Sequence, residues 1–185
     1  MQFGRDFSKE NLHLDYSDYD FISIELGQSH ARERGSLYTM NDLSFEENVH
    51  GTMLKKAIQL EKIPMFYSNI VKSSFDYLMH NTHTDMTSFY LREYRRTILL
   101  LYEEYSSHIA KHLGEYGYCV FLVEPHLYEF TAKSRRDLTG EEIASLFDSI
   151  VSTIKAKLPH AHISFYLKSG NYQKLHLPKE KYISF

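Results

Sequence analysis

Glu124 is the residue whose setting most directly suggests chemistry, because this carboxylate follows the apolar run YCVFLV and precedes Pro125. A carboxyl group at the end of a buried strand is partly removed from water, which raises its pKa and suits a general acid. Asp6 ends an earlier strand-like segment and can stay ionised. Such a pair would give glycoside cleavage its proton donor and the second carboxylate that stabilises positive charge on the sugar. The structural alternative is that Glu124 caps a neighbouring helix or pairs with an arginine or lysine.

Further polar residues stand at or just beyond the ends of the predicted strands. In parallel α/β folds the reacting groups gather there, because the loops converge at the carboxyl ends of rigid strands. We therefore expect substrate contacts from five residues, namely Glu25, Tyr67, Asn69, His126 and Asn171.

Metal and cofactor sites are not expected. The chain has 11 histidines, and two groups of them stand close in sequence, but neither His80, His83 and Asp85 nor His160 and His162 have the spacing of a known ligand set. A Gly-rich phosphate loop and a Gly-x-Ser-x-Gly elbow are both absent from the sequence.

The elements that position these residues follow from the spacing of apolar side chains. Strand-like runs cover residues 2–7, 20–26, 63–70, 118–123 and 162–167. Helical periodicity covers about 45–62, about 90 to Gly114, and 139–158, with the capping boxes Ser44–Glu47 and Thr139–Glu142 at two of the starts. Residues 27–43 form a long surface loop. The run 118–123 lacks polar alternation, which predicts a strand buried on both faces of a parallel sheet.

This order of elements predicts one α/β domain over residues 1–185, with a parallel sheet and alternating helices in an incomplete or compact (βα) barrel. A complete barrel usually takes about 250 residues, with about 200 as a lower bound, and this chain has 185. A homo- or hetero-oligomer that completes the sheet is therefore one alternative.

Charge and composition exclude several other classes. The 21 basic and 24 acidic residues nearly cancel, so nucleic acid is not an expected partner. Cys119 is the single cysteine and forms no internal disulfide. The first ten residues lack the apolar core of a signal peptide, and no apolar run approaches the roughly 18 residues of a membrane span. We expect a cytoplasmic protein with no membrane contact, export by another route remaining open.

Several segments resemble a known family. FGRDFS, YDFISIELG and YTMNDLSFEENVHGTMLKKAIQLEKIPMFY, within residues 3–70, together with FLVE at 121–124, are similar to glycoside hydrolase family 25, the muramidases (lysozymes) of phages and bacteria. The resemblance implies a barrel that cleaves a peptidoglycan-type polysaccharide, in which Asp6 matches the first-strand aspartate and Glu124 the proton donor. The chain departs from the family at Leu122, which replaces the aspartate of its Asp-x-Glu motif, and it has no Trp and no late-strand carboxylate.

Three functions follow from these observations. The first is a lysozyme-like glycoside hydrolase that acts on polysaccharide through Glu124 and Asp6. The alternative is a non-catalytic, barrel-derived binding or assembly module, as in a phage particle or toxin system, which Leu122 and the short chain favour. A nuclease is third, because Glu124, Glu129 and Lys133 resemble an acid-plus-lysine site, although the last two are too far apart for a Glu-x-Lys core.

Overall fold

The computed structural model describes residues 15–16, 18–27, 49–71, 87–114, 117–125, 127 and 138–165. Within these ranges a four-stranded parallel sheet has the order β1 (Phe21–Leu26), β2 (Ile63–Ser68), β3 (Val120–Val123) and β4 (His162–Phe165). The helices are α2 (Val49–Gln59), α4 (Thr87–Glu93), α5 (Arg95–Leu113) and α7 (Gly140–Lys157). The predicted α/β class with a parallel sheet is therefore confirmed. Among the described strands β1 and β4 are the two edges, so closure into a barrel stays a prediction.

The four described strands coincide with predicted ones, but some ends differ. The strand predicted over 63–70 ends at Ser68, because the chain is already helical at Ile70, and the one predicted from residue 118 begins at Val120. The helix predicted to residue 62 ends at Gln59, since the backbone of Glu61 turns with a φ of 55°. The predicted strand 2–7, the Ser44 capping box, residues 28–43 of the predicted loop and residues 166–167 lie outside the described residues.

The helix predicted from about residue 90 to Gly114 is interrupted. Helix α4 ends at Glu93 and α5 begins at Arg95, with Tyr94 between them at φ −98° and ψ 10°. The hydrogen bonds Tyr94 N to Tyr90 O and Ile98 N to Tyr94 O, each 2.9 Å, continue through the break. Periodicity could not reveal the interruption, because the apolar spacing runs on across it. The far end lies where expected, since Gly114 leaves the helix with a φ of 72°.

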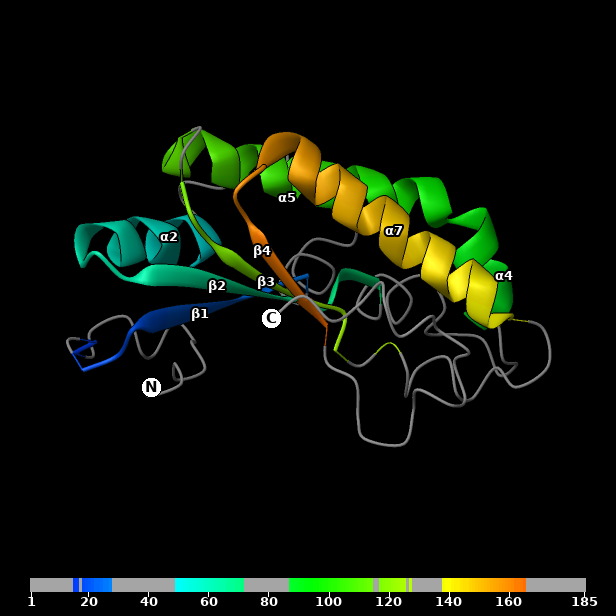
Figure 1. Ribbon diagram of the computed structural model, residues 1–185, viewed down its shortest axis with the longest axis horizontal. Helices are drawn as coiled ribbons and strands as arrows, with labels where there is room; N and C mark the ends of the chain where they lie inside the picture. The colour runs from blue at the N-terminus through cyan, green and yellow to red at the C-terminus, as the bar shows by residue number, and fades with distance from the viewer. Residues whose placement is uncertain are drawn as a thin grey trace.

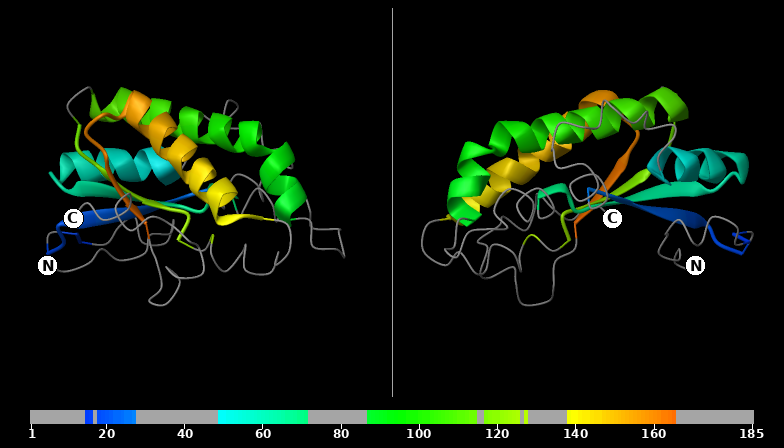
Figure 2. Two further views of the ribbon diagram at one scale, coloured as in Figure 1. Left: turned by 45° about the vertical axis from the view of Figure 1, so that its right-hand side comes forward. Right: turned by 180° about the vertical axis from the view of Figure 1, so that it is seen from behind.

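All the described helices lie over the same face of the sheet (Figures 1 and 2). Parallel crossovers share one hand, so a chain that adds each strand beside the previous one places each connecting helix on the same side. The strands turn alternate side chains toward these helices, and the core forms there. Phe66 packs on Phe121 with ring centroids 5.0 Å apart, and Phe165 meets Phe147 of α7 at 4.9 Å.

The prediction that residues 118–123 are buried on both faces is wrong. Phe121 and Val123 are buried beneath the helices, whereas Val120 and Leu122, on the other face, are only partly buried. Continuous apolar character normally means that helices cover both faces of a parallel strand. Here the described helices cover one face only, so the same apolar residues have unequal burial.

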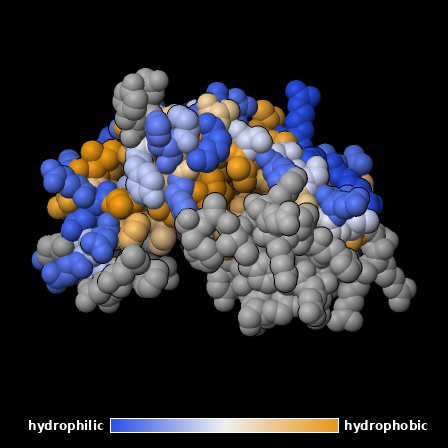
Figure 3. All heavy atoms as spheres, in the orientation of Figure 1, coloured by the Kyte–Doolittle hydropathy of each residue, from blue (hydrophilic) through white to orange (hydrophobic). Residues whose placement is uncertain are grey.

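The outer surface of the helix layer is mainly hydrophilic, with hydrophobic residues in the centre of the view in Figure 3. Five large hydrophobic side chains are exposed in the described ranges, at Ile58, Leu60, Phe89, Leu100 and Tyr118. In the same ranges no helix combines the length and apolar character needed to cross a bilayer.

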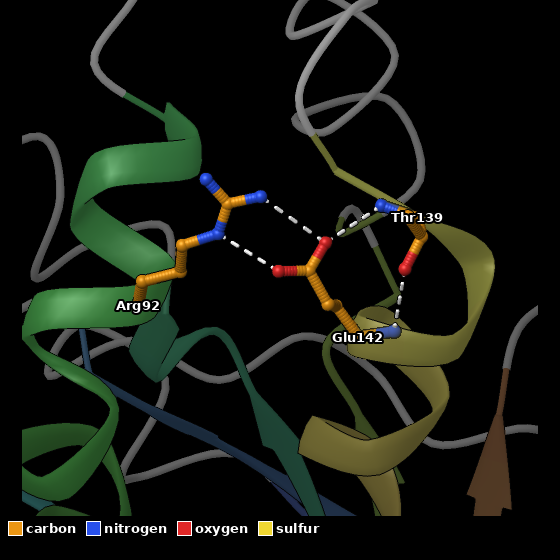
Figure 4. Close-up of polar contacts among 3 residues, drawn as sticks. All are labelled: Arg92, Thr139 and Glu142. Atoms are coloured by element: carbon orange, nitrogen blue, oxygen red, sulfur yellow. Dashed lines mark hydrogen bonds and ion pairs between the residues drawn. The ribbon is translucent and has the colours of Figure 1, made fainter.

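Helix α7 begins with the predicted capping box, which is confirmed. The Glu142 N–H donates to Thr139 Oγ1 at 3.2 Å, and the Thr139 N–H donates to Glu142 Oε2 at 2.9 Å. Figure 4 shows that Arg92 of α4 reaches the same carboxylate, donating from Nε to Oε1 at 2.8 Å and from Nη2 to Oε2 at 3.2 Å. The start of α7 is therefore fixed both locally and to α4.

These contacts predict a pH dependence of stability. Hydrogen bonding from Arg92, followed by that from the Thr139 backbone, lowers the pKa of Glu142 from 4.5 to about 2. A lowered folded-state pKa stabilises the fold above about pH 4.5, and the effect is lost as the pH falls through about 2. We expect Glu142→Gln to reduce the free energy of unfolding at pH 7 by at most about 1 kcal/mol, as for other exposed ion pairs, and by less near pH 2. Urea unfolding at both pH values measures this.

Glu141→Gln is the matched control, because Glu141 is exposed in the same helical turn. A difference between wild type and Glu142→Gln that stays constant from pH 7 to pH 2 would contradict the assignment.

Cys119 lies just before β3 with its side chain fully buried. Burial raises the pKa of its thiol to about 12, and only the thiolate reacts with disulfide reagents. We expect 5,5′-dithiobis(2-nitrobenzoate) at pH 8 to modify the native protein at least about a hundredfold more slowly than the unfolded chain. The absorbance of released thionitrobenzoate measures both rates, and equal rates would show that the thiol is accessible in the native fold.

Candidate functional site

Glu124 directly follows β3 at the carboxyl edge of the sheet and is only 3% exposed. Its backbone N–H donates to Ser68 O at 2.9 Å, and its own carbonyl accepts from Leu127 N at 2.9 Å. The φ of Glu124 is 43°, a left-handed value that is uncommon for a residue with a side chain. The backbone thus leaves the strand sharply at this residue, which turns the side chain away from the path of β3.

The carboxylate of Glu124 accepts two hydrogen bonds in the interior. The backbone N–H of Val71 donates to Oε1 at 2.8 Å, and the hydroxyl of Tyr102 on α5 donates to the same oxygen at 2.7 Å. Residues 70 and 71 are helical, so the first bond satisfies an N–H at the start of a helical segment, as a capping side chain does. This is the structural alternative that the sequence left open.

Tyr102 joins the carboxylate to the end of β2. Burial, and then the charge of Glu124, raise the pKa of the Tyr102 phenol well above 10, so the phenol keeps its proton and donates it to Glu124. The Ser68 hydroxyl lies 2.9 Å from the same phenol oxygen and is therefore the donor in that contact. Ser68, Tyr102, Glu124 and Val71 form a continuous buried chain of hydrogen bonds, which we call the edge network.

A second group of candidate residues lies on the opposite face of the sheet. The strand register pairs Glu25 with Tyr67, Tyr67 with Leu122, and Leu122 with Ser164. Neighbouring strands are about 4.8 Å apart, so these four side chains form a row across the sheet near its carboxyl edge, here called the cross-strand row. Glu25 is exposed, and the other three are partly buried. The structure thus brings together the predicted residues Glu25 and Tyr67.

The remaining predicted site residues have other fates. Asn69 is buried just past β2, where its backbone N–H donates to Leu26 O at 3.0 Å. Asp6, His126 and Asn171 lie outside the described residues, as do His80, His83 and Asp85. His160 and His162 are exposed, and in the described part of the chain no three His, Cys, Asp or Glu side chains converge as metal ligands do.

Sequence reasoning missed Ser68 and Tyr102. Tyr102 stands four residues after Ile98 and so belongs to the buried stripe of the helix, but a tyrosine in an apolar stripe normally counts as core. Its hydroxyl was the available signal, because a buried phenol needs a polar partner. Ser68 gave a weaker signal, as the last and only hydroxyl-bearing position on the helix-facing side of β2.

Comparison with known proteins gives no match. No family model, no curated protein and no solved structure is significantly similar to this chain. Conclusions about function therefore rest on the geometry of the edge network and the cross-strand row.

Removal of the Tyr102 hydroxyl tests the edge network. Tyr102→Phe keeps the ring but leaves Glu124 Oε1 and the Ser68 hydroxyl each without a partner. Since a buried polar group that loses its partner costs about 1–3 kcal/mol, we expect the free energy of unfolding to fall by about that amount in urea denaturation. Tyr118→Phe is the control, because Tyr118 is 49% exposed. Equal stability of the two variants would refute the network.

Proposed function

We propose that this chain is a barrel-derived module that binds a peptidoglycan-type polysaccharide over the cross-strand row, without using Glu124 as a proton donor. The observation that carries the proposal is the pairing of Glu25 with Tyr67 in register, on the face of the sheet that no described helix covers. A tyrosine ring offers a flat apolar surface for a sugar with a polar group at its end. A neighbouring carboxylate accepts hydrogen bonds from sugar hydroxyls.

The position of Glu124 supports binding over hydrolysis. A proton donor must come within hydrogen-bond reach of the oxygen that it protonates. The Glu124 carboxylate instead lies on the helix side of the sheet, 3% exposed and bonded to Tyr102 and Val71. The cross-strand row occupies the other side. Glu124 therefore serves to hold the carboxyl edge in shape.

A lysozyme-like glycoside hydrolase with Glu124 as the acid is the second candidate. One observation favours it, namely a buried carboxylate with left-handed backbone at the carboxyl end of a parallel strand. Barrel enzymes carry catalytic groups at such strand ends, and unusual backbone conformations cluster at active sites.

Sedimentation with insoluble cell-wall peptidoglycan tests the binding proposal. We expect wild type to co-sediment, and Tyr67→Leu and Glu25→Gln each to bind at least about fivefold more weakly, since one aromatic or charged contact contributes on the order of 1 kcal/mol. Tyr118→Leu and Glu141→Gln remove the same groups from exposed positions elsewhere and should bind like wild type. Failure of wild type to co-sediment would refute the polysaccharide ligand.

The same preparations decide between the two candidates. The turbidity of a peptidoglycan suspension should stay constant with wild type. Clearing by wild type that Glu124→Gln abolishes, while this variant still co-sediments, would overturn the non-catalytic proposal and establish the hydrolase. Circular dichroism of Glu124→Gln confirms that a loss of clearing does not reflect unfolding.

A further inference from the structure

A cavity of about 210 Å³ lies between the helices α4, α5 and α7. Its walls are mainly apolar and come from Leu91 of α4, Leu138 just before α7, and Ile143 and Leu146 of α7. Leu91, Ile143 and Leu146 are themselves buried. The volume is below the roughly 300 Å³ at which pockets for drug-sized ligands begin. The cavity therefore has room for a small molecule with an apolar body.

Three charged side chains also line this cavity, and two of them neutralise each other. Arg92 and Glu142 form the two-bond ion pair of Figure 4, with 49% and 37% of their side chains exposed. The N–H groups at the start of α7 are likewise engaged, because Thr139 and Glu142 form the capping box. Neither the ion pair nor the helix start is left to bind an anion.

Arg95 is the third charged residue, and its charge has no such partner. Its Nη2 donates to the Ser145 carbonyl at 2.7 Å, to Ser145 Oγ at 2.9 Å and to Ser149 Oγ at 2.7 Å. All three acceptors are neutral, and in the described ranges no carboxylate pairs with Arg95. These contacts fix the partly buried guanidinium against α7, while its Nη1 and Nε donors take no part in them.

We propose that this cavity binds a small monocarboxylate with an apolar body, such as an arylalkanoic acid. The apolar part lies among Leu91, Leu138, Ile143 and Leu146, and the carboxylate accepts hydrogen bonds from Arg95. Arginine suits this role because its planar donors bind a carboxylate at two points. A guanidinium that its own fold already holds in place loses little further freedom when the ligand binds. The site is separate from the cross-strand row and does not depend on the polysaccharide proposal.

Titration of the full chain with 3-phenylpropionate, followed by isothermal calorimetry, tests the site. We expect saturable 1:1 binding, with 3-phenylpropionamide at least tenfold weaker because it lacks the charge, and acetate at least tenfold weaker because it lacks the apolar body. This comparison uses wild type alone, so it does not depend on whether a variant folds. Equal affinity for the acid and the amide, or no binding of any of the three probes, would overturn the proposal.

Variants then assign the binding to this cavity. Arg95→Gln should weaken 3-phenylpropionate binding at least tenfold and leave the weak amide binding unchanged. Arg96→Gln removes the same charge from the exposed neighbouring position, outside the cavity lining, and should bind like wild type. Equal losses in the two variants would indicate a general charge effect and refute the site.

Discussion

One topological constraint determines most of this structure. Each strand lies beside the one before it, all four run parallel, and crossovers of one hand then place every described helix over the same face. That face has the hydrophobic core, with Ile24, Phe66 and Phe121 aligned across three strands. The opposite face is left with a mixed row of carboxylate, aromatic, aliphatic and hydroxyl groups. The same constraint brings α5 and α7 side by side in one layer, and the monocarboxylate cavity lies in that layer.

The edge network satisfies the polar groups that such a sheet leaves at its carboxyl edge. Where parallel strands end beneath a helix layer, their last polar groups are enclosed, and an unpaired buried group costs about 1–3 kcal/mol. The carboxylate of Glu124 bonds to the Val71 N–H and, through Tyr102, reaches Ser68. Three segments distant in sequence are thereby linked at one carboxylate. A leucine at residue 124 would pack in this space but would leave these donors unsatisfied.

The sequence predicted the strands and helices well because their signals are local. Apolar spacing located β1, β4 and α7, and the pair Thr139 and Glu142 identified the helix start. The break at Tyr94 and the one-sided burial of β3 could not be predicted, since both depend on how distant elements pack. For the site, the strand-end rule selected Glu124, Glu25 and Tyr67 correctly as edge residues. It could not tell on which face each would lie, because that depends on the register and on the turn of the backbone at Glu124.

The backbone at Glu124 bears on whether this residue can also act on a substrate. A left-handed conformation at a non-glycine residue costs on the order of 1–3 kcal/mol and persists where the surroundings fix it. Here four hydrogen bonds do so, two to the carboxylate and two to the backbone N–H and carbonyl. To reach a sugar on the opposite face, the carboxylate would have to give up the bonds from Val71 and Tyr102, at about 1–3 kcal/mol each. The strain is thus retained by the same contacts that keep the carboxylate inside, which is the arrangement of a structural joint.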